Sequence, residues 1–157
     1  MKEQILTKPE VIDKLKKGSL WIGIVCVLAV LFNLAACMIL FFRYRSPDVT
    51  DAVTQYTMIR EFVTYGLSAA IMLLAAMMFL HIAKDGMPFT VKRVRTVRII
   101  GILFLLNAVI PTVVIGGVIT PFSVTNYSSL IEGLLFLFIA HIIRYGAMLQ
   151  QESDETL

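Results

Sequence analysis

The chain has 157 residues, of which 58% are hydrophobic and only 16% are charged. Soluble domains carry about 25% charged residues, so this composition excludes an ordinary water-soluble globular protein. The formal charge of +3 is modest, and Lys and Arg cluster beside the ends of apolar blocks. That placement suits anionic lipid headgroups, and we expect no direct binding to nucleic acid. Cys26 and Cys37 share one apolar block and do not form the disulfide framework of a small secreted domain.

Four long apolar blocks follow one another along the chain, and each is close to the length of about 20 residues that crosses a bilayer. Inside hydrocarbon every backbone amide must bond within its own segment, so we predict helices. The sequence therefore predicts an all-α fold, an integral membrane four-helix bundle that forms a single domain over 1–157. The spans are predicted at about 20–42, 62–82, 99–119 and 127–143.

Two short amphipathic helices are predicted at the membrane surface. Over 8–17, apolar residues recur on one face after Thr7-Lys8-Pro9-Glu10, which has the form of a capping box. Over 47–60, apolar residues recur at helical spacing after Ser46-Pro47-Asp48, which is typical of a helix start.

The placement of Lys and Arg predicts the orientation. With the amino terminus inside, the outer segments hold only Arg43, Arg45 and Arg60, and all other basic residues lie inside. Because basic residues concentrate on the cytoplasmic side of membrane proteins, the pattern predicts four crossings with both termini in the cytoplasm. We therefore expect a multi-pass protein that contacts membrane lipids.

The two halves of the chain share a short pattern. His81–Gly86 and His141–Gly146 both read His-Ile-x-basic-x-Gly at the inner end of a span, and each half also contains Leu-x-Asn, ending at Asn33 and Asn107. These matches favour two pseudo-repeated helical hairpins related by an axis along the membrane normal. The alternative is that histidine, a basic residue and a terminating glycine are common at any inner helix end.

Glu132 is the residue that most strongly suggests intramembrane chemistry, because a carboxylate inside a span is costly unless it pairs, takes up a proton or faces water. The alternative places it among the outer headgroups. His81 and His141 should lie at similar depth, but two histidines beside cations make a poor metal or haem site, so we expect no metal and no cofactor. Asn33 and Asn107 are expected to form hydrogen bonds between helices.

The richest polar surface is predicted on the cytoplasmic side. Thr90 would cap a helix that continues into the third span, and Val91, Val94 and Val97 recur every three residues with basic residues between them. The tail from Gln150 is acidic, so it would attract this basic segment or a partner; a frayed, solvated tail is the alternative. The candidate partner-contacting or lipid-contacting residues are Lys92, Arg93, Arg95, Arg98, Glu152, Asp154 and Glu155.

The cytoplasmic segments resemble a family of uncharacterised small bacterial membrane proteins with four predicted spans, a domain of unknown function. The similar segments are Gly86–Thr90, Lys92–Gly101, Arg144–Gln150 and Glu152–Leu157, and the resemblance extends over nearly the whole chain. Members are often encoded beside a Cro-like helix-turn-helix regulator. The resemblance therefore implies a bacterial cytoplasmic membrane protein with a role in regulation or in envelope stress or immunity, and a helix-turn-helix regulator as its cytoplasmic partner.

The sequence contains no nucleophile–base–acid arrangement, phosphate-binding glycine loop or Cys-x-x-Cys motif, so we do not expect an enzyme. The leading hypothesis is a non-enzymatic polytopic membrane protein that acts through its basic loop and acidic tail. The alternative is a small proton- or cation-coupled transporter or exporter that uses Glu132 and works as a homo-oligomer. Flux that depends on Glu132 would distinguish the transporter from the regulator.

Overall fold

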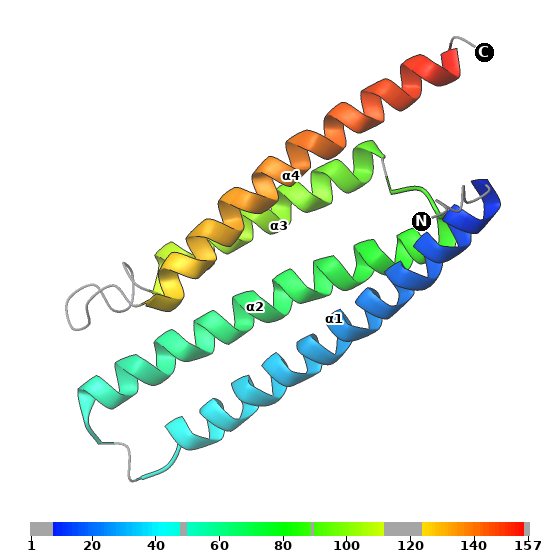
Figure 1. The fold of residues 1–157 in the computed structure, drawn as a ribbon. Helices are drawn as coiled ribbons and strands as arrows, with labels where there is room; N and C mark the ends of the chain where they lie inside the picture. Colours follow the sequence, from blue (N-terminus) through cyan, green and yellow to red (C-terminus); the bar gives the residue numbers. More distant parts are fainter. Residues whose placement is uncertain (1–7, 48–49, 89, 112–123, 156–157) are drawn as a thin grey trace, which may run out of the picture.

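Four long helices make up the fold in a computed structural model of the chain (Figure 1), which describes residues 8–47, 50–88, 90–111 and 124–155. The helices are α1 (Lys8–Tyr44), α2 (Ala52–Asp85), α3 (Val91–Val109) and α4 (Val124–Glu155). No strand occurs in these described ranges, and the predicted all-α four-helix fold is confirmed.

The helices run up and down as two antiparallel hairpins, α1 with α2 and α3 with α4 (Figure 1). Contact is most extensive within each hairpin, and the two hairpins meet through a smaller contact between α2 and α3. As a result the start of α1, the end of α2, the start of α3 and the end of α4 all lie at the same end of the molecule (Figure 1). This arrangement determines which charged residues are brought together.

Polar caps begin α2 and α3, and a glycine ends α2. The carboxylate of Asp51 accepts from the backbone N–H of Thr54 at 3.1 Å, and the hydroxyl of Thr90 accepts from the backbone N–H of Arg93 at 3.4 Å, as predicted for a cap at Thr90. Gly86 adopts a φ of 73°, and its N–H donates to the carbonyl of Ile82 at 2.7 Å. This left-handed backbone favours glycine and stops the helix.

The helices α1, α2 and α4 are longer than the spans predicted for them. α1 runs without interruption from Lys8, so the amphipathic segment predicted over 8–17 is the first part of one helix, and most of the segment predicted over 47–60 likewise belongs to α2. Thr7 of the predicted capping box lies outside the described residues. The regular part of α3 ends at Val109, and the second half of the span predicted over 99–119 is largely outside them as well.

Each half of the chain forms a helical hairpin, but the shared pattern His-Ile-x-basic-x-Gly has a different local structure in the two halves. Gly86 terminates α2, whereas Gly146 lies inside α4, which continues to Glu155. The predicted hydrogen bonds between helices also differ: the Asn33 amide donates to the carbonyl of Ala29 on its own helix at 2.8 Å, and the buried Asn107 Oδ1 has no partner in the described chain. A carbonyl one turn back is within reach of a side-chain amide in a helix, so the Asn33 amide is satisfied on its own helix.

Close packing between helices occurs where a glycine faces the neighbouring helix. A Cβ built on Gly133 of α4 would lie 3.0 Å from the Gly101 carbonyl oxygen of α3, and a Cβ on Gly101 would lie 3.1 Å from the Gly133 carbonyl oxygen. In the other hairpin, Gly23 of α1 lies against Leu80 of α2. Such small residues let two backbones approach each other closely, as is common between membrane helices.

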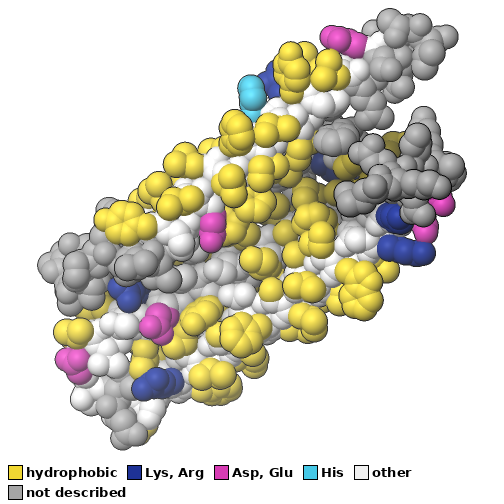
Figure 2. Space-filling model, in the orientation of Figure 1, with side chains coloured by type: hydrophobic (Ala, Val, Ile, Leu, Met, Phe, Trp, Pro, Cys, Tyr) yellow, Lys and Arg dark blue, Asp and Glu magenta, His cyan; other side chains and the backbone are white. Residues whose placement is uncertain are grey.

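Large apolar side chains cover the outside of the helices, and Figure 2 shows them across most of the visible face. On α1, Trp21 and Phe32 are 69% and 71% exposed. Three helices are long and apolar enough to cross a membrane, over Glu10–Tyr44, Ala52–Asp85 and Tyr127–Gly146. The described part of α3 is not among them, because its first half carries four basic residues. A hydrocarbon solvent would accommodate this exposed apolar surface.

Candidate functional site

One end of the molecule carries most of its positive charge. It is formed by the start of α1, the end of α2, the start of α3 and the end of α4 (Figure 1). These four segments hold every described Lys and Arg except Arg43, Arg45 and Arg60. We call this the basic end. The helix arrangement thus brings together basic residues that are far apart in the sequence.

The basic residues at the start of α3 face two different directions. Lys92, Arg95 and Arg98 recur every three residues and are exposed, and we call them the exposed basic face. Arg93 points the other way and is buried, with 8% of its surface exposed. Its burial removes Arg93 from the surface that a partner protein could reach, although the sequence placed it in the same contact set.

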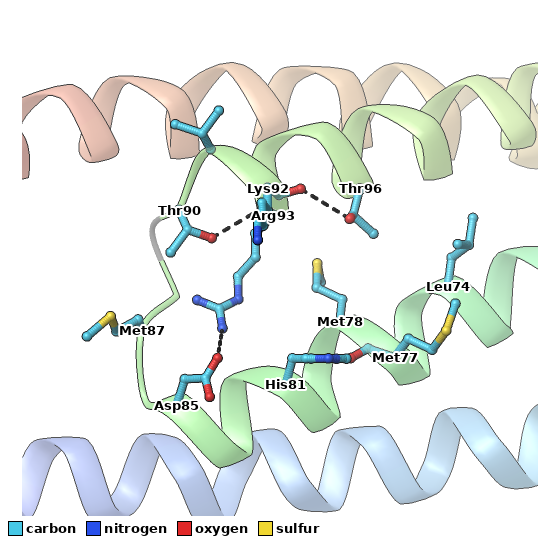
Figure 3. A pocket seen from close by; sticks show the side chains of 11 residues that line it. Leu74, Met77, Met78, His81, Asp85, Met87, Thr90, Lys92, Arg93 and Thr96 are labelled. Carbon is cyan, nitrogen blue, oxygen red and sulfur yellow. Dashed lines mark hydrogen bonds and ion pairs between the residues drawn. The ribbon is translucent and has the colours of Figure 1, made fainter.

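The side chain of Arg93 links the start of α3 to the end of α2. Its Nη2 donates to Oδ2 of Asp85 at 3.3 Å, as Figure 3 shows, and the Asp85 side chain is half exposed. Nη1 of Arg93 is fully buried and has no hydrogen-bond partner among the residues that the structure describes. An unpaired buried donor costs about 1–3 kcal/mol, and more when it is charged. The ion pair with Asp85 therefore satisfies only part of this guanidinium.

A pocket of about 600 Å³ lies beside this ion pair, between the end of α2 and the start of α3 (Figure 3). Leu74, Met77 and Met78 of α2 make its apolar part. The polar part comes from both helices and contains Asp85, His81, Lys92, Arg93, Thr90 and Thr96. The volume lies within the range of small-molecule sites in proteins, about 300–1,000 Å³.

His81 has one of its ring nitrogens engaged. Nδ1 lies 2.7 Å from the carbonyl oxygen of Met77, one turn earlier on α2. A carbonyl only accepts hydrogen bonds, so the proton of this bond is on Nδ1. Nε2 is then left as an acceptor in the neutral ring or as a donor in the charged ring, at the wall of the pocket.

The other residues predicted from the sequence lie outside this pocket. Glu132 is exposed on α4, beside Gly133, which is buried against α3. Glu152 is exposed near the end of α4, and the side chains of Asp154 and Glu155 are outside the described residues. The helix itself continues to Glu155, so the backbone of the acidic segment is helical over most of its length rather than frayed.

The two histidines lie on different helices, and neither belongs to a described group of side chains that could hold a metal ion. His81 is exposed on α2 and His141 is exposed on α4. Within the described ranges no group of three or more His, Cys, Asp or Glu side chains is placed to hold a metal ion.

Sequence reasoning missed Asp85, the methionines and the pocket that they line. The available signal was Asp85 itself, an acidic residue between Lys84 and the terminating Gly86 in a segment that is otherwise basic. Comparison of the chain with protein-family models, with curated proteins and with solved structures found no match.

Proposed function

We propose that this chain is a four-span protein of a bacterial cytoplasmic membrane, with both termini and the α2–α3 connection in the cytoplasm. Three helices have the length and apolar composition of spans, and residues 99–119 would supply the fourth crossing. The basic end supports this orientation, because Lys and Arg next to spans concentrate on the cytoplasmic side.

We further propose that the protein is non-enzymatic and acts as a regulator, or as an envelope stress or immunity factor, by binding a cytoplasmic partner. The observation that supports this function is the exposed basic face, where Lys92, Arg95 and Arg98 project together from the start of α3. Exposed charges of one sign speed association with an oppositely charged surface and make it depend on salt. The partner would therefore present an acidic patch, and the helix-turn-helix regulator implied by the family resemblance is the first to test.

The acidic end of α4 fits the same proposal. The last turns of α4 extend past the start of α3 at the basic end of the molecule (Figure 1). Acidic residues at this end lower its net positive charge, and a partner with a stronger acidic patch would compete with them for the basic residues. Removal of the chain after Met148 would then change how tightly the partner binds.

A crosslinking experiment followed by a binding measurement tests the partner contact. A photoreactive amino acid at position 95 should crosslink to the regulator in living cells, and the same amino acid at the exposed Lys14 of α1 is the control. With purified proteins, a variant that carries both Arg95→Glu and Arg98→Glu should bind the partner about tenfold more weakly, or weaker still. Partner binding by the unaltered protein should weaken steeply as the salt concentration rises. Lys14→Glu should leave the affinity nearly unchanged. Equal crosslinking at both positions, or equal loss in both variants, would contradict the proposal.

A further inference from the structure

The pocket between α2 and α3 contains a buried positive group that is only partly neutralised. The Arg93 side chain is 9% exposed, its Nη2 bonds to Asp85 at 3.3 Å, and its Nη1 has no partner in the described chain. Arg93 lines the pocket, and Figure 3 shows its side chain extending from α3 toward Asp85 of α2. A guanidinium offers five donors in a planar fork, so Nη1 keeps donors that the oxygen atoms of an anion would satisfy.

The other charged groups of the pocket also favour an anion. Lys92 adds a second positive charge to the lining, and Asp85 is its only carboxylate among the described residues. His81 carries either no charge or a positive charge, and the hydroxyls of Thr90 and Thr96 are neutral. The net charge of the lining is therefore positive. The N-terminus of α3 lies at the same place and adds its partial positive charge.

The rest of the lining is apolar and indicates the remainder of the ligand. Leu74, Met77 and Met78 continue the pocket along α2, away from the ion pair. A single inorganic anion would occupy only a small part of about 600 Å³ and would leave these side chains facing a space that it does not fill. A molecule with a phosphoryl group at one end and hydrocarbon at the other fits both parts.

We propose that this pocket binds the phosphoryl group of an anionic phospholipid, with Nη1 of Arg93 donating to a phosphoryl oxygen and the glycerol and first acyl carbons lying against Met77 and Met78. The pocket adjoins the apolar length of α2, so a lipid of the adjacent leaflet reaches it without leaving the membrane. This site shares Lys92 with the exposed basic face, but Arg93 is buried, and Arg95 and Arg98 do not line the pocket. Loss of partner binding in the variant with Arg95→Glu and Arg98→Glu would therefore leave the lipid site intact.

Native mass spectrometry of the full chain in detergent, titrated with phosphatidylglycerol, tests this proposal. Arg93→Gln should weaken lipid retention about tenfold, because a charge-assisted hydrogen bond is lost. The control Arg95→Gln removes the same charge from an exposed position on the same helix and should change retention less than about twofold. Asp85→Asn removes the carboxylate that competes for the guanidinium, and it should strengthen retention. This opposite effect keeps the test valid even if Arg93→Gln loosens the contact between the two hairpins.

Two further titrations identify the source of the phosphoryl group. Phosphatidylcholine, which carries a compensating positive charge, should be retained more weakly than phosphatidylglycerol, and inorganic phosphate alone should compete poorly. Strong competition by inorganic phosphate would assign the pocket to a free anion and overturn the lipid assignment. Equal losses in Arg93→Gln and Arg95→Gln, or weaker retention in Asp85→Asn, would overturn the site itself.

Discussion

The crossing of α3 and α4 at Gly101 and Gly133 gives the sharpest test of how this protein packs. In Gly133→Ala the new methyl group would lie 2.7 Å from Leu105 Cδ2 and 3.0 Å from the carbonyl oxygen of Gly101. Leu105 can rotate, but the carbonyl belongs to the backbone of α3, so the two helices must move apart. Such overpacking costs about 1–3 kcal/mol.

Gly66→Ala is the matched control for this substitution. Gly66 lies inside α2, and a Cβ there meets nothing within 4 Å. Both variants gain the same helix propensity, about 1 kcal/mol for Ala over Gly, so the difference between them isolates the cost of the crossing. We expect Gly133→Ala to have a free energy of unfolding about 1–3 kcal/mol lower than that of Gly66→Ala.

Steric trapping in bicelles measures this difference, because two streptavidin molecules bind labels on α3 and α4 only after the helices separate. Gly101→Ala should behave like Gly133→Ala, since its methyl group would lie 3.1 Å from the Gly133 carbonyl oxygen. If Gly133→Ala proved as stable as Gly66→Ala, the close approach of the two backbones would be refuted.

Three further outcomes are expected. Reporter fusions after Gly86 and after Leu157 should report the cytoplasm, and fusions at Asp51 and Ser123 the outside; a cytoplasmic signal at Asp51 would overturn the orientation. The backbone N–H of Thr54 donates to the carboxylate of Asp51 and makes the largest contribution to lowering its pKa below the ordinary value of 3.8. The hydroxyl of Thr54 also donates to this carboxylate and lowers the pKa further. Because the folded state favours the charged form, the cap contributes at pH values above 3.8 and is lost as the pH falls through the lower, folded pKa. The protection of amides at the start of α2, measured against their intrinsic exchange rate at each pH, should therefore fall in acid. Asp51→Asn should remove this pH dependence, and an unchanged fall in that variant would show that Asp51 is not responsible. Glu132→Gln should leave folding and partner binding unchanged. If the unaltered protein carried out proton-coupled flux in proteoliposomes and Glu132→Gln abolished it, the transporter would be favoured.

The helical fold could be predicted from the sequence because it depends on hydropathy alone. The blocks of apolar residues predict how many helices form, and Thr90 predicts where α3 begins. The lengths could not be predicted in the same way. The polar residues that flank a span, such as those over 8–17, are compatible with a continuing helix, and nothing before Ser19 breaks α1.

The candidate site was predicted only in part, because a run of basic residues does not reveal which of them face inward. On a helix, Arg93 lies on the same face as Val94 and Val97, which are buried, whereas Arg95 lies on the opposite face. The partner of Arg93 is Asp85, across the turn that connects α2 with α3. That pairing depends on the angle between two helices, and no local pattern encodes it.

The two hairpins also have a consequence for the order in which the protein is made. The most extensive helix contact, between α1 and α2, joins neighbours in the chain, and so does the contact between α3 and α4. The ribosome therefore completes the first hairpin before α3 exists, and α1 and α2 find each other without waiting for a distant segment. Among the described residues, the main contact that joins the first hairpin to the second is the smaller one between α2 and α3, with the Asp85–Arg93 pair at its edge, and it forms as the second hairpin is synthesised.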